Sequence, residues 1–150
     1  MIRINRVLLA LLSLTLPGAA AEKSLQLRDL PAAVQKTVTE QAKGAEIKNI
    51  SMEKEHGVSQ YEVETMLNGR HRDFNVDTKG ALVVVEEEST MDAVPAPVKA
   101  AMLKKAGTGK ITMVETVTKG SETMYEAAIT SKAGKKSEAL FKADGTPAKD

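Results

Sequence analysis

The sequence contains no cysteine and no tryptophan, and its 150 residues include only two tyrosines, two phenylalanines and two histidines. The absence of cysteine excludes disulfide frameworks, thiolate metal sites and cysteine nucleophiles. Neither sign of charge dominates, since 21 lysines and arginines stand against 20 aspartates and glutamates. The composition therefore does not indicate a nucleic-acid-binding protein. The length and the 42% hydrophobic content fit one ordinary domain or two very small ones.

The one long apolar run lies at residues 7–16, after two arginines and before Pro17-Gly18 and several alanines. This order is typical of a secretory signal peptide, and the run is about half of the roughly 20 residues needed to span a bilayer. Ala19 and Ala21 supply the small residues of a cleavage site. We therefore expect residues 1–21 to be a signal peptide, and the mature protein to be periplasmic or secreted without a membrane anchor.

The rest of the sequence indicates an internal repeat. At a spacing of 64 residues, segment 30–34 aligns with segment 94–98, and Tyr61-Glu62 aligns with Tyr125-Glu126. The repeat predicts two units, residues 22–88 and residues 89–150.

Each unit begins with a helix pattern, in which a proline precedes apolar residues at every fourth position. Runs rich in valine, isoleucine, threonine and tyrosine follow, separated by glycine turns, as in an antiparallel meander. We predict an α+β fold of two tandem repeats, each one helix packed on a three- to four-stranded antiparallel sheet. The residues expected to face the sheet are Leu30, Val34, Val38 and Ala42 in the first helix, and Val94, Val98, Met102 and Ala106 in the second.

Asn68-Gly69 is the clearest turn signal, because both central positions of a type I′ turn need a positive φ. A two-residue turn there pairs Val63 with Phe74 inside the fold. The same register sets Glu64 opposite Asp73 on the outer face. In the second unit, the corresponding hairpin has a three-residue turn, and its register pairs a tyrosine with a phenylalanine inside: Tyr125 with Phe141.

Like charges directly across a strand pair destabilise a sheet, so something must offset the repulsion between Glu64 and Asp73. Solvation can do so together with nearby basic residues, namely Lys48, Lys54, Arg70 and Arg72. Alternatively, the pair belongs to a surface that binds a cationic partner, or to a weak divalent-cation site that includes His71. The second hairpin carries lysines at its turn and would present a basic contact.

Several of these motifs carry a family resemblance. The Leu30-Pro31 and Val94-Pro95 helix starts, the Tyr61 to Glu64 strand and the Asp77 to Gly80 turn resemble the PepSY-like, β-lactamase-inhibitor-like periplasmic domain family. The resemblance covers roughly residues 27–150. It implies a tandem pair of helix-plus-sheet repeats that binds other envelope proteins without catalysing a reaction. In the best-understood architecture of this kind, the sheet grips an enzyme and a hairpin loop plugs its active site.

Together these patterns predict a non-enzymatic periplasmic protein-binding module, an inhibitor or modulator of an envelope enzyme. The sequence contains no serine-hydrolase, phosphate-loop or zinc-protease motif. We expect no cofactor, no metal, no nucleic acid, an envelope protein as partner, and a monomer or weak dimer. The alternatives are a small-ligand or divalent-cation-binding envelope protein, and a self-associating structural module. The residues predicted to bind the partner are Glu62, Glu64, Arg70, His71, Asp73, Lys132, Lys135 and Lys136.

Overall fold

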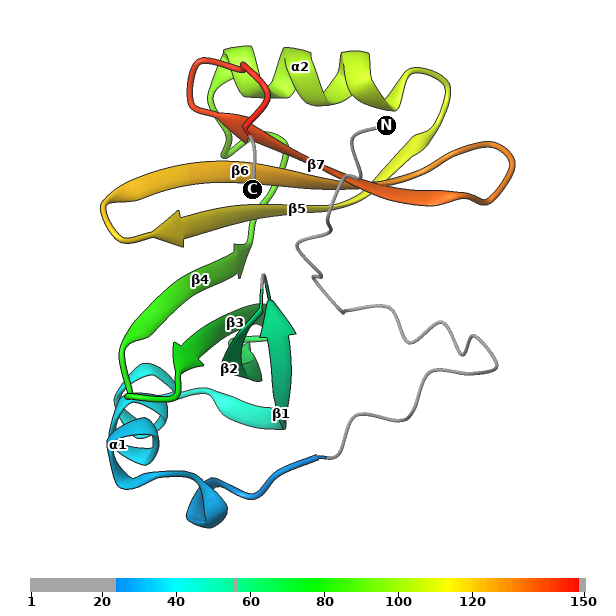
Figure 1. Ribbon diagram of the computed structural model, residues 1–150. Coiled ribbons are helices and arrows are strands. Elements are labelled where there is room, and N and C mark those ends of the chain that lie inside the picture. Colours follow the sequence, from blue (N-terminus) through cyan, green and yellow to red (C-terminus); the bar gives the residue numbers. More distant parts are fainter. Residues whose placement is uncertain (1–23, 56, 149–150) are drawn as a thin grey trace.

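All strands that the structure describes lie in one antiparallel sheet (Figure 1). The computed structural model describes residues 24–55 and 57–148, so the expected signal peptide lies outside the described residues. The strands follow one another across the sheet in chain order, and each is hydrogen-bonded to the next. The elements are η1 (Leu27–Asp29), α1 (Ala32–Gln41), β1 (Glu46–Glu55), β2 (Val58–Leu67), β3 (Arg70–Asp77), β4 (Leu82–Glu88), α2 (Ala96–Ala106), β5 (Lys110–Lys119), β6 (Glu122–Thr130) and β7 (Lys136–Lys142).

The two predicted helices are confirmed, and each begins directly after a proline. Pro31 and Pro95 occupy the N-cap positions with extended backbone, and neither helix has a side-chain cap. Proline suits this place because its fixed φ is compatible with helix entry and it has no N–H to leave unsatisfied. Asp92 does not cap α2 but accepts a bond from Lys99 Nζ at 2.6 Å.

The prediction of two tandem repeats, each with its own sheet, is wrong. Strand β4 pairs with β5 from Val85 opposite Thr118 to Glu88 opposite Glu115, so a single seven-stranded sheet runs through the molecule. The physical reason is that each separate sheet would expose a strand edge with unpaired backbone groups, and pairing β4 with β5 satisfies both edges at once. The polar residues 86–88 take part in this pairing.

Two separate hydrophobic clusters hold the helices on the sheet. The prediction that the aromatic residues lie inside is confirmed for Tyr61, Phe74 and Phe141, which are buried, while Tyr125 is partly buried against the second cluster. The α1 cluster consists of Leu30, Val34, Val38, Ala42, Ile50, Tyr61, Val63, Phe74 and Val76. The α2 cluster consists of Val94, Val98, Met102, Val114, Ala127, Ile129 and Phe141.

Both predicted hairpins have the expected register. Asn68 and Gly69 have φ values of 53° and 78°, as a type I′ turn requires, and Val63 lies opposite Phe74. In the second hairpin, Tyr125 lies opposite Phe141, as predicted. Short turns of defined type thus fix which residues face the helices.

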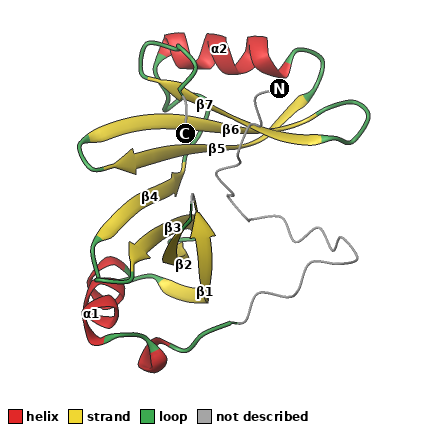
Figure 2. Cartoon of the chain, in the orientation of Figure 1, coloured by secondary structure: helices red, strands yellow, loops and turns green. Residues whose placement is uncertain are grey.

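Helix α1 packs at the β1–β4 end of the sheet and α2 at the β5–β7 end (Figure 2). The strand register places both helices on the same face. Val85 of β4 packs against the α1 cluster and pairs with Thr118 of β5. Cross-strand partners share a face, and every second residue along a strand returns to that face. Thr118 therefore shares its face with Val114 of the α2 cluster. The opposite face carries neither α1 nor α2, and we call it the open face.

Candidate binding face

Acidic side chains cross the open face from β2 to β6. The register places Asp73 of β3 opposite Glu86 of β4, and Glu115 of β5 between Glu88 of β4 and Glu126 of β6. This arrangement carries a line of carboxyl groups across the junction of β4 and β5. We call the following residues the acidic band: Glu62, Glu64, Asp73, Glu86, Glu88, Glu115 and Glu126.

On β2 and β3, hydrogen-bond donors hold the carboxylates. Asn49 Nδ2 donates to Glu64 Oε1 at 3.2 Å, and Ser51 Oγ donates to Glu62 Oε2 at 3.4 Å. The backbone N–H of Thr65 donates to Asp73 Oδ1 at 2.7 Å. These donors offset the repulsion expected between Glu64 and Asp73.

Arg72, one of the basic residues expected to balance this pair, lies on the helix face instead. Its guanidinium donates to Gln41 O at 2.8 Å and to Gln41 Oε1 at 3.0 Å, at the end of α1. It also bonds Glu87 Oε1 at 3.2 Å and lies 5.7 Å from the centroid of the Phe74 ring. Arg72 therefore fastens α1 to the sheet and does not neutralise the acidic band.

At the junction of β4 and β5, apolar neighbours replace the donors. Glu86 lies opposite Val117, which in turn lies opposite Met124. Glu86 is 6% exposed and Glu115 is 2% exposed, and Glu115 Oε1 has no hydrogen-bond partner among the described residues. A carboxylate in such surroundings loses its hydration without gaining a donor, which favours the protonated form.

The pKa values follow this division. Burial raises the pKa of Glu86 to about 9, with a smaller contribution from the neighbouring carboxyl groups of Glu115 and Glu126. Burial also raises the pKa of Glu115 to about 8, with Glu126 contributing. Burial raises the pKa of Asp73 only to about 6, because the N–H of Thr65 stabilises the charged form. Glu86 and Glu115 are therefore protonated at neutral pH, and Asp73 is mostly ionised.

The structure brings together only part of the predicted partner-binding set. Glu62 and Asp73 are buried on the open face, with Glu64 and His71 half-buried beside them. The alternation along β3 places Arg70 on the helix face, with Arg72 and Phe74. The lysines of the second hairpin are exposed, and strands β4 and β5 lie between the two hairpins. They are Lys132, Lys135 and Lys136.

Sequence reasoning missed the acidic residues of the junction. Glu86 and Glu88 alternate along β4, and Glu115 and Glu126 lie opposite each other. Because Glu87 stands between Glu86 and Glu88, the run shows no alternation of polar and apolar residues that would signal one face of a strand. Their meeting at one place depends on the pairing of β4 with β5, which no local pattern reveals.

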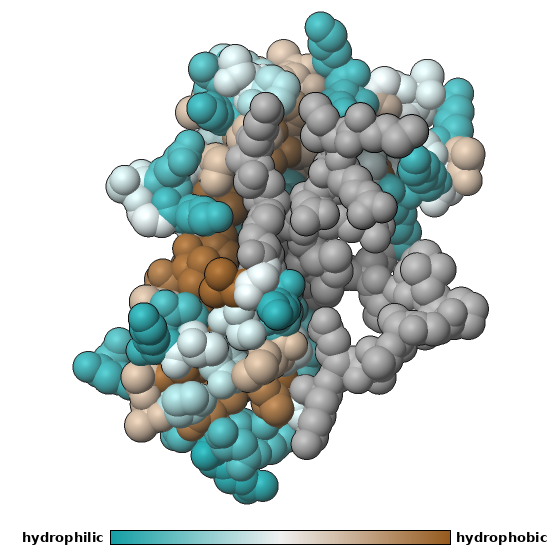
Figure 3. Space-filling model, viewed as in Figure 1, coloured by the Kyte–Doolittle hydropathy of each residue, from teal (hydrophilic) through white to brown (hydrophobic). Residues whose placement is uncertain are grey.

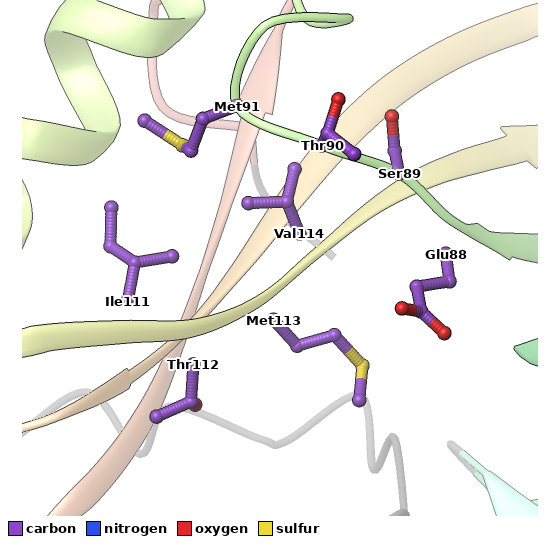
Figure 4. A pocket seen from close by; sticks show the side chains of 8 residues that line it. All are labelled: Glu88, Ser89, Thr90, Met91, Ile111, Thr112, Met113 and Val114. Carbon is purple, nitrogen blue, oxygen red and sulfur yellow. The ribbon is translucent and has the colours of Figure 1, made fainter. Parts of the chain in front are cut away.

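Two further features lie near this face. Figure 3 shows apolar surface over β4, and Leu82, which is 42% exposed there, lies opposite Val76 of the α1 cluster, on the helix face. A hollow of about 220 Å³ lies between β5 and the segment after β4 (Figure 4). Its methionines, Met91 and Met113, lie on opposite sides of β5, so their sulfur atoms do not converge. In the described residues, no group of three or more histidine, aspartate or glutamate side chains is placed to hold a metal ion.

The sequence matches no family model and no curated protein. Among solved structures it is similar to a protein from Bacteroides eggerthii that is assigned to the periplasm. The identity is 18%, the TM-score is 0.64, and the match covers 80% of this chain and 86% of that one. It is also similar to a DUF2874 family protein from Bacteroides uniformis, with 20% identity, a TM-score of 0.63 and coverage of 79% and 86%.

A third similar structure is a BLIP-like protein from Bacteroides fragilis, with 20% identity, a TM-score of 0.57 and coverage of 79% and 83%. These likenesses show a shared fold, and the BLIP-like neighbour agrees with the inhibitor-like part of the predicted resemblance. The periplasmic location predicted from the sequence matches that assigned to such neighbours. No helix in residues 24–148, apart from the undescribed position 56, is long and apolar enough to cross a membrane.

Proposed function

We propose that this chain is a non-catalytic protein of the periplasm that binds another envelope protein on the open face of its sheet. The observation that carries the proposal is the placement of α1 and α2 on one face, which leaves the other face of a seven-stranded sheet without a helix. A sheet face of this size that carries neither α1 nor α2 and is rich in charged groups suits a protein partner.

The neighbours support the proposal at the level of the fold. One is named BLIP-like, and the descriptions of the three neighbours reported above name no enzymatic activity. Modulation of an envelope enzyme fits these names, and kinship with PepSY-like domains remains a prediction from sequence motifs. The divalent-cation alternative is less favoured, because the described carboxyl groups form no metal-binding constellation.

Crosslinking in periplasmic extract tests the proposal, with the tagged protein purified as the cell exports it. The site variant is Glu64→Lys, which reverses a half-buried charge on the open face. The matched control is Glu40→Lys, which makes the same change on the exposed side of α1. We expect one stoichiometric partner, identified by mass spectrometry, that the control retains and the site variant loses. Equal capture by both variants contradicts docking on the open face.

A further inference from the structure

The acidic band contains an acceptor that the described part of the chain does not satisfy. Glu115 is 2% exposed, and its Oε1 has no hydrogen-bond partner in the described residues. Its cross-strand neighbours on the open face are Glu88 and Glu126. Both flanking positions thus carry another carboxyl group instead of a cation. A buried acceptor in this position calls for a donor from outside the band.

Basic residues of the chain lie at the margin of the open face. His71 contributes its backbone N–H to Glu88 Oε2 at 3.1 Å, and Arg72 lies on the opposite face. The acidic groups that face Glu86 and Glu115 from neighbouring strands are Glu62, Asp73, Glu88, Glu126 and Glu138. The basic residues that the register places on this face, at strand ends or on the last strand, are His71, Lys110, Lys119, Lys136 and Lys142.

We propose that the acidic band recognises lysine or arginine side chains of a protein partner, and that docking releases protons from Glu86 and Glu115. This inference rests on the proposed function and specifies the chemistry of the partner. A cationic side chain beside Glu115 supplies both the missing donor and the missing counter-charge. Each neutral carboxyl group gives one proton to the solvent, and the carboxylate formed pairs with the cation. The two partners are thus complementary in charge only once docked.

The expected signature is binding that strengthens as the pH rises. A cation favours the ionised form of a carboxyl group, so proton release and cation binding are linked. Burial keeps Glu86 and Glu115 neutral at pH 6, so docking at this pH must remove both protons. At pH 8.5 a larger fraction of these carboxyl groups is already ionised before docking. Ordinary surface glutamates are ionised throughout this range and give no such dependence.

Isothermal titration calorimetry tests the inference with a pentalysine peptide as the probe and a pentaglutamate peptide as its control. Titrations at pH 6 and pH 8.5, each in two buffers of different ionisation enthalpy, measure affinity and protons released. We expect pentalysine to bind about tenfold more tightly at pH 8.5, with net proton release. The double variant Glu86→Gln/Glu115→Gln should bind about tenfold more weakly at pH 8.5 and release no protons.

The control is the double variant Asp29→Asn/Glu40→Gln, which changes two exposed carboxyl groups, at η1 and on α1, to amides. It should bind pentalysine as the wild type does. Absence of pentalysine binding, or an equal loss in both double variants, overturns the inference. A partner protein that is lost with Glu64→Lys but retained at full affinity by Glu86→Gln/Glu115→Gln overturns it too, while the binding function stands. Proton-linked pentalysine binding without any captured partner supports the inference and contradicts the protein-binding function.

Discussion

The two parts of the open face carry the same kind of side chain in different surroundings. On β2 and β3, carboxylates meet donors, as Glu64 meets the amide of Asn49 and Asp73 meets the N–H of Thr65. At the junction of β4 and β5, Glu115 Oε1 has no hydrogen-bond partner among the described residues, and Glu86 faces Val117. The difference teaches that strand neighbours, more than the number of acidic residues, decide whether a sheet carboxyl group is charged.

On the helix face, by contrast, the two ends of the sheet are alike, because a glycine in a turn packs closely against a helix at each end. The turn after β3 packs Gly80 against α1, and the turn after β7 packs Gly145 against α2. A Cβ on Gly80 would lie 2.7 Å from Ala33 C, and a Cβ on Gly145 would lie 2.5 Å from Pro97 O. The two ends thus hold their helices by the same close glycine contact. On the open face, β3 keeps Asp73 mostly ionised, whereas the junction of β4 and β5 keeps two buried glutamates neutral.

The largest effect is expected from pH, acting on the junction alone. Glu86, with a pKa of about 9, and Glu115, with a pKa of about 8, hold protons in the folded protein that the unfolded chain releases near pH 4.5. Protons bound more strongly by the folded state stabilise it at low pH. The free energy of unfolding should therefore fall between pH 5 and pH 9, by up to about 1.4 kcal/mol per pH unit for each proton.

Urea denaturation at pH 5, 7 and 9 measures this slope, and Glu86→Gln/Glu115→Gln should flatten it. The exposed aspartates Asp77, Asp92 and Asp144 have lowered pKa values, so their contribution is lost only at acid pH, as they become protonated. A wild-type protein equally stable at pH 5 and pH 9 would show that the junction carboxyl groups are not held neutral.

The next prediction tests whether close packing of a turn glycine against a helix stabilises both ends of the sheet. Gly80→Ala and Gly145→Ala should each lower the free energy of unfolding by roughly 3 kcal/mol, from a left-handed φ and a Cβ clash with helix backbone. Gly69→Ala is the matched control, because its φ is +78° but nothing lies within 4 Å of the added Cβ. It should cost only about 1 kcal/mol. Equal losses in all three variants would show that close packing on the helices contributes nothing.

The sequence predicts the local parts of this fold well. Asn68-Gly69 fixes one hairpin, and the apolar residues at every fourth position locate both helices. The single sheet could not be predicted, because the pairing of β4 with β5 joins residues that are about 30 positions apart and carries no turn signal. For the same reason the sequence indicated Glu64 and Asp73 within one hairpin, but not the meeting of Glu86 with Glu115.

A smaller loss is expected on the donor-rich part of the open face. Asp73→Ala should lower the free energy of unfolding by about 1 to 2 kcal/mol at pH 8, because it leaves the buried N–H of Thr65 without its acceptor. Asp73→Asn keeps an acceptor oxygen and should cost less. At the junction of β4 and β5 the change in the free energy of unfolding has the opposite sign, since Glu115→Gln should stabilise the protein at pH 8 or above. Destabilisation of similar size by Glu115→Gln at that pH would remove the contrast between the two parts.

The smallest effect concerns α1, which is held to the sheet by an arginine contact that α2 does not share. The guanidinium of Arg72 bonds both the carbonyl and the side chain of Gln41 at the end of α1, whereas the last turn of α2 carries Lys104 and Lys105 of its own. Arg72→Lys should cost about 1 kcal/mol, because an ammonium group does not reproduce the bidentate geometry. Hydrogen exchange by mass spectrometry locates the loss, with faster exchange expected in α1 and unchanged exchange in α2. Faster exchange in both helices would mean that the two clusters open together, and that the sheet couples its ends more strongly than their separate cores suggest.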